Sequence, residues 1–129
     1  MRFMMLMIPK GYEKAAPGAM PDAKTIAAMM KYNESLQKAG VLLSGEGLHP
    51  PSMGARVSFA GGKPKVTDGP FTEAKEGVGG FAVLEFRSKK EALEGAIGFM
   101  ELHKKYWPGW EGETEVRQLL GPEDFAPKA

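Results

Sequence analysis

The chain has 129 residues, of which 43% are hydrophobic and 26% charged, as expected for one soluble domain with its own core. Its 17 basic and 16 acidic residues leave a formal net charge of +1. No strong field is therefore available to attract nucleic acid or a membrane surface. The lack of cysteine excludes disulfides, thiolate metal sites and cysteine nucleophiles.

The first predicted element is a strand over residues 2–8, which are mostly apolar and end at Pro9. This apolar run is too short for a secretory signal, and no small-residue cleavage site follows it. No stretch approaches the roughly 20 apolar residues that span a bilayer. We therefore expect a cytoplasmic protein without a membrane segment, consisting of one domain over residues 1–129.

A loop is predicted over residues 9–21, followed by a helix with Asp22 as its N-cap and an end at Gly40. Helical spacing predicts one mostly apolar stripe on this helix, made of Ile26, Met29, Met30, Asn33 and Leu36. A second strand is predicted from Val41 to Leu48.

Two short strands are predicted next, from Arg56 to Phe59 and from Lys65 to Thr67, with a tight turn at Gly61-Gly62 between them. The run Phe81–Phe86 then predicts another strand that is buried on both faces.

A capping box at Ser88 and Glu91 predicts the start of a second helix, which should stop near Tyr106 because Pro108-Gly109 cannot continue it. We expect its apolar face to consist of Leu93, Ala96, Ile97 and Met100. A last strand is predicted over residues 114–120, and residues 121–129 should form a polar, frayed tail.

This order, strand-helix-strand, hairpin, strand-helix-strand, predicts an α+β fold, a ferredoxin-like βαβ–hairpin–βαβ sandwich. Two helices cover only one face of such a sheet, yet residues 3–8 and 81–86 are apolar on both sides. No third helix is predicted that would cover the other face. We therefore expect a homodimer in which a second copy covers it through an isologous interface.

The run from Thr67 to Glu76, Thr-Asp-Gly-Pro-Phe-Thr-Glu-Ala-Lys-Glu, lies between two predicted strands, where a working loop is expected. It resembles the signature of the DGPF branch of the YCII-related family. Further matching runs are Gly40-Val41-Leu42, Gly45-Glu46-Gly47-Leu48 with Pro50, Gly79-Gly80-Phe81 and Glu115-Val116-Arg117. The resemblance implies a dimeric α+β barrel, built of two ferredoxin-like units packed sheet to sheet.

The YCII-related family is suspected of enzymatic activity because of a histidine near the start of the first helix and an aspartate after the second. In this chain the first predicted helix contains no histidine, and residues 104–110 contain no aspartate. The family's pair therefore cannot be transferred to this sequence. Some similar proteins are joined to a sigma-factor-like domain, which implies a link to transcription.

Asp68 and His49 are the candidate catalytic residues. Asp68 could act as a general base, or it could accept backbone N–H groups and fix the turn before Gly69; in either case we expect partial burial. His49 ends a strand beside two prolines and could transfer protons near neutral pH. If the chain is an enzyme, the two side chains should face one cleft. Glu46 has the opposite strand parity to His49, which weakens a Glu–His pair.

The other candidate ligand-binding residues lie in the same loop and are Gly69, Pro70, Phe71, Lys75 and Glu76. For Phe71 we favour a plug of the core under the loop over a pocket wall, and an exposed ion pair is the simpler interpretation of Lys75 and Glu76. Outside the loop, His103 suits a helix C-terminus, and packing is a more frequent role for Trp107 and Trp110 than stacking on a flat ligand.

The spacing of the two histidines gives no metal-ligand pattern, and no nucleotide-binding motif occurs, so we expect neither a metal nor a cofactor. Two functions stay open. The first is a small cofactor-free enzyme, lyase-like or isomerase-like, acting on a small organic molecule. The second is a non-catalytic ligand-binding or regulatory module that contacts a protein of the transcription machinery.

Overall fold

The structure is a computed structural model that describes residues 1–16, 18, 20–69 and 77–125. None of the helices in this described part combines the length and apolar character needed to cross a membrane. In chain order the described elements are β1 (Arg2–Pro9), η1 (Tyr12–Lys14), α1 (Ala23–Lys38), β2 (Leu42–Gly47), η2 (Pro51–Met53), β3 (Ala55–Ala60), β4 (Lys63–Asp68), β5 (Gly80–Glu85), α2 (Lys89–Tyr106), β6 (Gly112–Gln118) and α3 (Pro122–Phe125).

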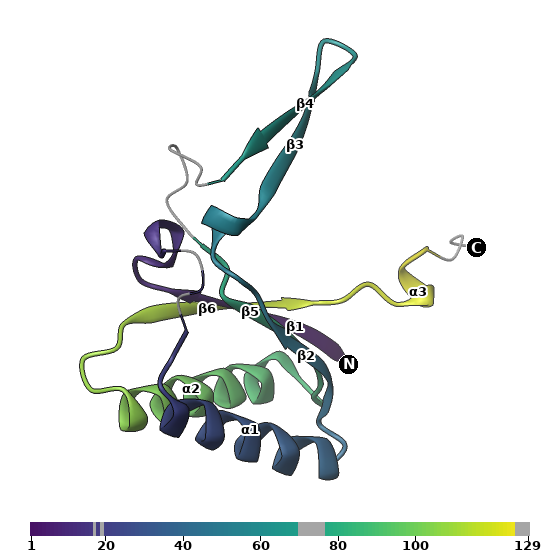
Figure 1. Cartoon of the computed structure of the whole chain (residues 1–129). Helices are drawn as coiled ribbons and strands as arrows, with labels where there is room; N and C mark the ends of the chain where they lie inside the picture. The colour runs from purple at the N-terminus through teal and green to yellow at the C-terminus, as the bar shows by residue number, and fades with distance from the viewer. Residues whose placement is uncertain (17, 19, 70–76, 126–129) are drawn as a thin grey trace.

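The described residues form an antiparallel four-stranded sheet in the order β2-β5-β1-β6, and β3 pairs only with β4 in a separate hairpin. Both long helices lie on the same side of the sheet, and the hairpin projects on the other side (Figure 1). The fold is therefore α+β, and its strand order is compatible with the predicted ferredoxin-like arrangement.

The core lies between the sheet and the two helices. Met5 pairs with Ala82 on one side and with Val116 on the other, and all three side chains face the helices together with Leu84. Phe3 and Leu84 are opposite each other in the register and are both buried. Alternation along the strands thus gives the helix-facing side a continuous apolar layer.

Helix α1 begins and ends where its sequence signals predict. The Asp22 carboxylate accepts a hydrogen bond from the backbone N–H of Thr25 at 2.7 Å, and Gly40 has a φ of +75° just after the helix. The predicted apolar stripe is wrong at Met30, whose side chain is 66% exposed. Asn33 is exposed as well, whereas Thr25, in the first turn of the helix, is buried.

Helix α2 also has its predicted start, since the Ser88 hydroxyl accepts the N–H of Glu91 at 3.2 Å. Its predicted apolar face is wrong at Leu93 and Ile97, which are exposed. The prediction is confirmed at Ala96, and Ala92 and His103 are the other buried residues of this helix. Small alanine side chains let the helix approach the sheet closely, and the larger aliphatic side chains point away.

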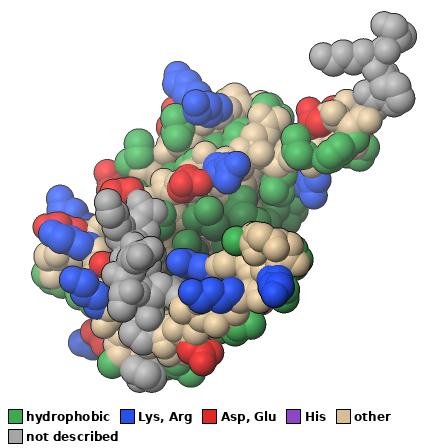
Figure 2. Space-filling model, turned by 90° about the horizontal axis from the view of Figure 1, so that it is seen from above, with side chains coloured by type: hydrophobic (Ala, Val, Ile, Leu, Met, Phe, Trp, Pro, Cys, Tyr) green, Lys and Arg blue, Asp and Glu red, His purple; other side chains and the backbone are tan. Residues whose placement is uncertain are grey.

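The face of the sheet opposite the helices is open. Met4, Leu6, Phe81 and Val83 alternate with the core residues, so they lie on this face, where each is only partly buried. Figure 2 looks down on this side and shows hydrophobic side chains in the middle of the molecule, bordered by charged ones. We call these four residues the apolar strip.

The C-terminal prediction requires a correction. Residues 122–125 form the one-turn helix α3, where the Asp124 carboxylate accepts the N–H of Gly121 at 2.7 Å, and residues 126–129 lie outside the described part. A third helix therefore exists, contrary to the expectation. It lies beyond the end of the sheet rather than over its open face (Figure 1), so the open face still lacks a cover among the described residues.

Candidate functional site

A cleft of about 820 Å³ lies at the end of the sheet where β1 ends and β6 begins. We call it the terminal cleft. Its walls come from the η1 region, the face of α1, the segment after β2 and the loop between α2 and β6. Most of the lining is apolar or aromatic, and its polar side chains include Lys10, Tyr12, Asn33, His49 and Glu111.

His49 is one of the predicted catalytic residues, and the structure places it in the terminal cleft. Its backbone is held on both sides, because the N–H of Leu48 donates to the carbonyl of Gly79 at 2.9 Å and Pro50 is fully buried. The imidazole itself is exposed. A fixed backbone with an exposed ring suits a group that exchanges protons with a bound molecule.

Tyr12 adds a second polar group to the cleft, which the sequence did not predict. Its hydroxyl donates to the carbonyl of Leu48 at 2.5 Å, next to His49. Burial raises the pKa of the Tyr12 phenol, so the group stays neutral at physiological pH. Because its proton is used by Leu48, the hydroxyl oxygen is left as an acceptor for a ligand.

The loop after α2 forms an aromatic wall. Trp110 lies against the buried ring of His103, with ring centroids 4.8 Å apart, and His103 also contacts Phe99 edge-on at 4.6 Å. The Nδ1 of His103 lies 2.9 Å from the Phe99 carbonyl, which can only accept, so Nδ1 carries the proton. His103 therefore packs against one face of the Trp110 ring, and the predicted packing role of this tryptophan is confirmed for that face.

Trp107 differs from Trp110, because its side chain is 44% exposed and lines the terminal cleft. Both tryptophans thus contribute to the wall of the terminal cleft, and stacking on a flat ligand stays a prediction. The turn at Pro108-Gly109 places both rings near the same opening, and this turn was the available signal in the sequence.

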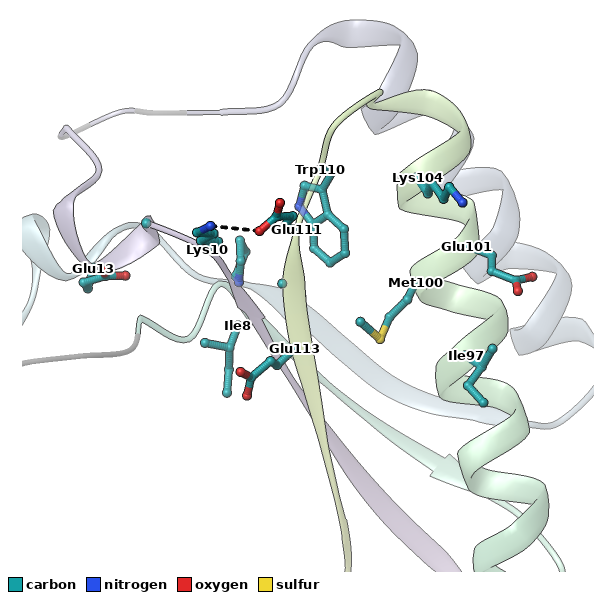
Figure 3. Close-up of a pocket in the computed structure, with 13 residues that line it drawn as sticks. Ile8, Lys10, Glu13, Ile97, Met100, Glu101, Lys104, Trp110, Glu111 and Glu113 are labelled. Atoms are coloured by element: carbon teal, nitrogen blue, oxygen red, sulfur yellow. Dashed lines mark hydrogen bonds and ion pairs between the residues drawn. The ribbon is translucent and has the colours of Figure 1, made fainter.

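Lys10 and Glu111 line the terminal cleft and also the neighbouring pocket that Figure 3 draws, and they form an ion pair of 2.9 Å. The hydrogen bond and the positive charge of Lys10 lower the pKa of the Glu111 carboxyl, and Glu111 raises the pKa of Lys10 in turn. Both groups are therefore charged near neutral pH. Glu111 is a poor proton donor in this state, but the pair can orient a polar part of a ligand.

A smaller cavity of about 260 Å³ lies between the sheet and the helices, among Met5, Tyr32, Leu36, Leu84 and Phe99. We call it the inner chamber. Met29, Asn33, Gly47 and Gly79 line both the inner chamber and the terminal cleft, so the two spaces adjoin. Apolar cavities of about 150 Å³ already bind benzene, so the chamber is large enough for the apolar part of a small molecule.

The structure places Asp68 elsewhere. It ends β4 opposite Ala55, its side chain is exposed, and none of the described N–H groups donates to its carboxylate. The expected partial burial is therefore wrong. The turn is held by the backbone instead, because the N–H of Gly69 donates to the carbonyl of Gly54 at 2.8 Å.

Asp68 is also not among the described residues that line the terminal cleft, so the structure does not bring it together with His49 there. Of the remaining predicted ligand-binding residues, Gly69 is described and lies against η2. Pro70, Phe71, Lys75 and Glu76 lie outside the described residues. Within the described part no cluster of three or more His, Asp or Glu side chains could hold a metal ion.

The fold is that of a small α+β protein, and the terminal cleft is large enough for a small molecule. A family model described as a YCII-related domain matches residues 1–98, so the chain belongs to the YCII-related family. The matched part includes β1 through most of α2, and with them His49 and Tyr12, whereas the tryptophan wall lies beyond it. None of the curated proteins matches the chain.

Proposed function

We propose that this YCII-related chain binds a small organic molecule in the terminal cleft and acts on it as a cofactor-free enzyme of the lyase or isomerase type. The proposal rests on one observation, that the terminal cleft and the inner chamber adjoin and differ in polarity. A wide cleft with His49 and Tyr12 opens beside an apolar inner chamber. The favoured ligand therefore has a polar end for the cleft and a slender or flat apolar part for the chamber.

His49 is the group proposed to transfer a proton. A neutral imidazole has one ring nitrogen that accepts a proton and one that donates, so it can take a proton from one position of a substrate and return it at another. The oxygen of Tyr12 is placed to accept a hydrogen bond from a substrate hydroxyl or amine. Trp107 and Trp110 offer flat faces that orient an unsaturated group by stacking.

A thermal-shift screen against a metabolite library tests ligand binding, because a ligand that binds only the folded chain raises its melting temperature. Each hit is repeated with Leu36→Phe, which fills the inner chamber, and with Leu93→Phe, an exposed helix position outside both spaces. The shift should be lost in the first variant and kept in the second. Equal shifts in both variants would contradict a ligand in the chamber.

The hits are then incubated with the parent chain and with His49→Gln, and the mixtures are followed by NMR for new products. An enzyme of the proposed type converts a hit, and His49→Gln binds it but converts it at least about a hundredfold more slowly, the usual contribution of general acid–base catalysis. Unchanged turnover in His49→Gln would remove the catalytic role.

The second candidate is a non-catalytic ligand-binding or regulatory module, which senses a metabolite or contacts a protein of the transcription machinery. It is favoured by the position of Asp68, because no described acid other than the ion-paired Glu111 lines the cleft beside His49. Binding without conversion of any hit, by the parent and by His49→Gln alike, would support this module instead of the enzyme.

We also propose that the chain is a homodimer of two ferredoxin-like units packed through the open faces of their sheets, as a dimeric α+β barrel. The apolar strip supports this proposal, since it is bordered by Glu46 on β2 and by Glu115 and Arg117 on β6. An apolar centre within a polar border is typical of an interface. Light scattering at micromolar concentration should give twice the mass of the chain, and a monomeric mass would contradict the dimer.

A further inference from the structure

The hairpin β3–β4, residues 55–68, projects from the body, and we call it the arm. Its register places Val57 opposite Val66 and Phe59 opposite Pro64, so these four side chains share one face. Val57, Phe59 and Val66 are 67%, 73% and 65% exposed. The arm therefore presents a row of bare apolar side chains to solvent.

An isolated two-stranded hairpin is marginally stable in water unless its apolar face packs against something else. In the described structure neither strand of the arm pairs with a strand of the main sheet. The arm also rises from the open side of the sheet, away from both helices (Figure 1). The fold of one copy therefore supplies no cover for this face among the described residues.

A groove of about 780 Å³ lies along the opposite edge of the molecule, between β6 and α2, and we call it the side groove. Figure 3 shows Ile8, Ile97, Met100 and Trp110 around the groove, with the carboxylates of Glu13, Glu101, Glu111 and Glu113 about it. Ile97 is 57% exposed. This second surface thus combines the exposed Ile97 and the partly buried Met100 and Trp110 with an acidic rim.

We propose that the arm of one copy docks in the side groove of a second copy of this chain. The charges of the two surfaces are complementary. The arm carries Arg56, Lys63 and Lys65 against Asp68, while the lining of the groove carries four glutamates against Lys10 and Lys104. The apolar faces match as well, so docking would cover both at once and attract the arm electrostatically.

The geometry of the sheet allows the arm of each copy to dock in the side groove of the other. The arm follows β2 and the groove adjoins β6, which are the two edges of the sheet. Both lie at the same end of the strands, because Met7 and Gly47 pair with Gly80, and Pro9 pairs with Gly112. A two-fold axis parallel to the strands brings opposite edges together and keeps the same ends together.

The reach of the arm is sufficient in this arrangement. Packed sheets lie about 10 Å apart, and a strand of six residues, such as β3, extends about 20 Å. Each arm would therefore pass the partner's sheet and reach the layer between that sheet and its α2. The inference rests on the homodimer proposed above. It adds that the arm of each copy contacts the side groove of the other.

The experiment uses two variants that each break one surface. Phe59→Ser removes the most exposed apolar side chain of the arm, and Ile97→Glu places a charge on the floor of the groove. Their matched controls are Thr67→Ser, on the other face of the arm, and Leu93→Glu, one turn from Ile97 and outside the groove. Dimer dissociation constants are measured by analytical ultracentrifugation.

Each damaged variant should dissociate at least about tenfold more readily than the parent, because it lacks the burial of a large apolar side chain at both contacts of the dimer. Both controls should match the parent. Circular dichroism checks the fold, and Val66→Ser and Glu101→Lys replace any variant that does not fold.

Mixing the two damaged variants gives the decisive result. In the mixed dimer, the intact arm of the Ile97→Glu chain meets the intact groove of the Phe59→Ser chain, so one of the two contacts is restored. The mixed dimer should therefore be tighter than either variant alone. A mixed dimer no tighter than the single variants would overturn the docking of arm in groove.

The remaining outcomes separate this inference from the homodimer. If the parent is a dimer and Phe59→Ser or Ile97→Glu dimerises equally well, the arm or the groove has another use, such as a small ligand or a different protein. The docking is then overturned while the homodimer stands. If the parent is a monomer at micromolar concentration, both proposals fail.

Discussion

The strand β5 and the strand β3 have the same length and both contain a phenylalanine, but they meet very different surroundings. β5 lies inside the main sheet, and its Leu84 is 4% exposed. β3 lies in the arm, and its Phe59 is 73% exposed. Both segments have enough β-forming residues to make a strand, so the difference arises from their neighbours in space. A strand pattern predicts extended backbone, and burial depends on what packs against it.

The first prediction tests this contrast with the same kind of truncation in both regions. Leu84 packs with Met5 and Ala96 in the core, so Leu84→Ala should lower the free energy of unfolding by about 2–5 kcal/mol. Val66→Ala on the arm should change it by less than about 0.5 kcal/mol at concentrations where the chain is monomeric. Urea denaturation measures both, and losses of similar size would show that the arm is packed in the single copy.

The second prediction concerns the root of the arm. A Cβ at Gly69 would lie 1.7 Å from the Pro51 carbonyl oxygen, a backbone atom that cannot move aside freely. Gly69→Ala should therefore lower the free energy of unfolding by about 1–3 kcal/mol, as overpacking does.

The control for the root of the arm is Gly47→Ala, because a Cβ there would meet no atom within 4 Å and the residue is outside the left-handed region. The same urea denaturation is used. If Gly69→Ala is as stable as Gly47→Ala, the close approach of the arm to η2 does not exist in solution.

The third prediction, with the smallest expected effect, concerns the N-cap of α1, which lies outside the arm. The hydrogen bonds from Thr25 lower the pKa of Asp22 below its usual value of 3.8. A lowered folded pKa means that the charged N-cap stabilises α1 fully above the usual aspartate pKa, and that this stability is lost as the pH falls through the folded value. Asp22→Asn keeps an acceptor but does not titrate. The free energies of unfolding of the parent and the variant should therefore differ above pH 4 and converge in acid. Stability curves of the two proteins that stay parallel down to the lowest pH measured would contradict this role.

Local signals predicted the elements well, because each depends on a few neighbouring residues. Asp22 and Ser88 cap the two long helices, Gly40 ends the first, and Gly61-Gly62 turns the arm with φ values of +61° and +77°. The helix faces were predicted less well. Periodicity grouped Leu93 and Ile97 with Ala96, but of these three only Ala96 is buried, because a close approach of helix to sheet favours small side chains.

The candidate site was predicted only in part. His49 was identified because prolines beside a strand end hold its backbone, and it lines the terminal cleft. Tyr12 and Trp107 were not chosen, because they join His49 only when the η1 turn and the loop after α2 meet at one end of the sheet. Asp68 was chosen from its motif, but the exposure of its side chain depends on the direction of the arm.

By itself the sequence determined the order of the described strands and of the two long helices, the turns and caps that limit them, and the membership of the YCII-related family. These properties are local, or are carried by runs of consecutive residues. Only the tertiary structure decided which residues from distant segments form the terminal cleft, and which apolar side chains stay uncovered on the sheet, the arm and α2. The physical reason is that burial and proximity belong to pairs of surfaces, and a surface acquires its partner only when the chain has folded.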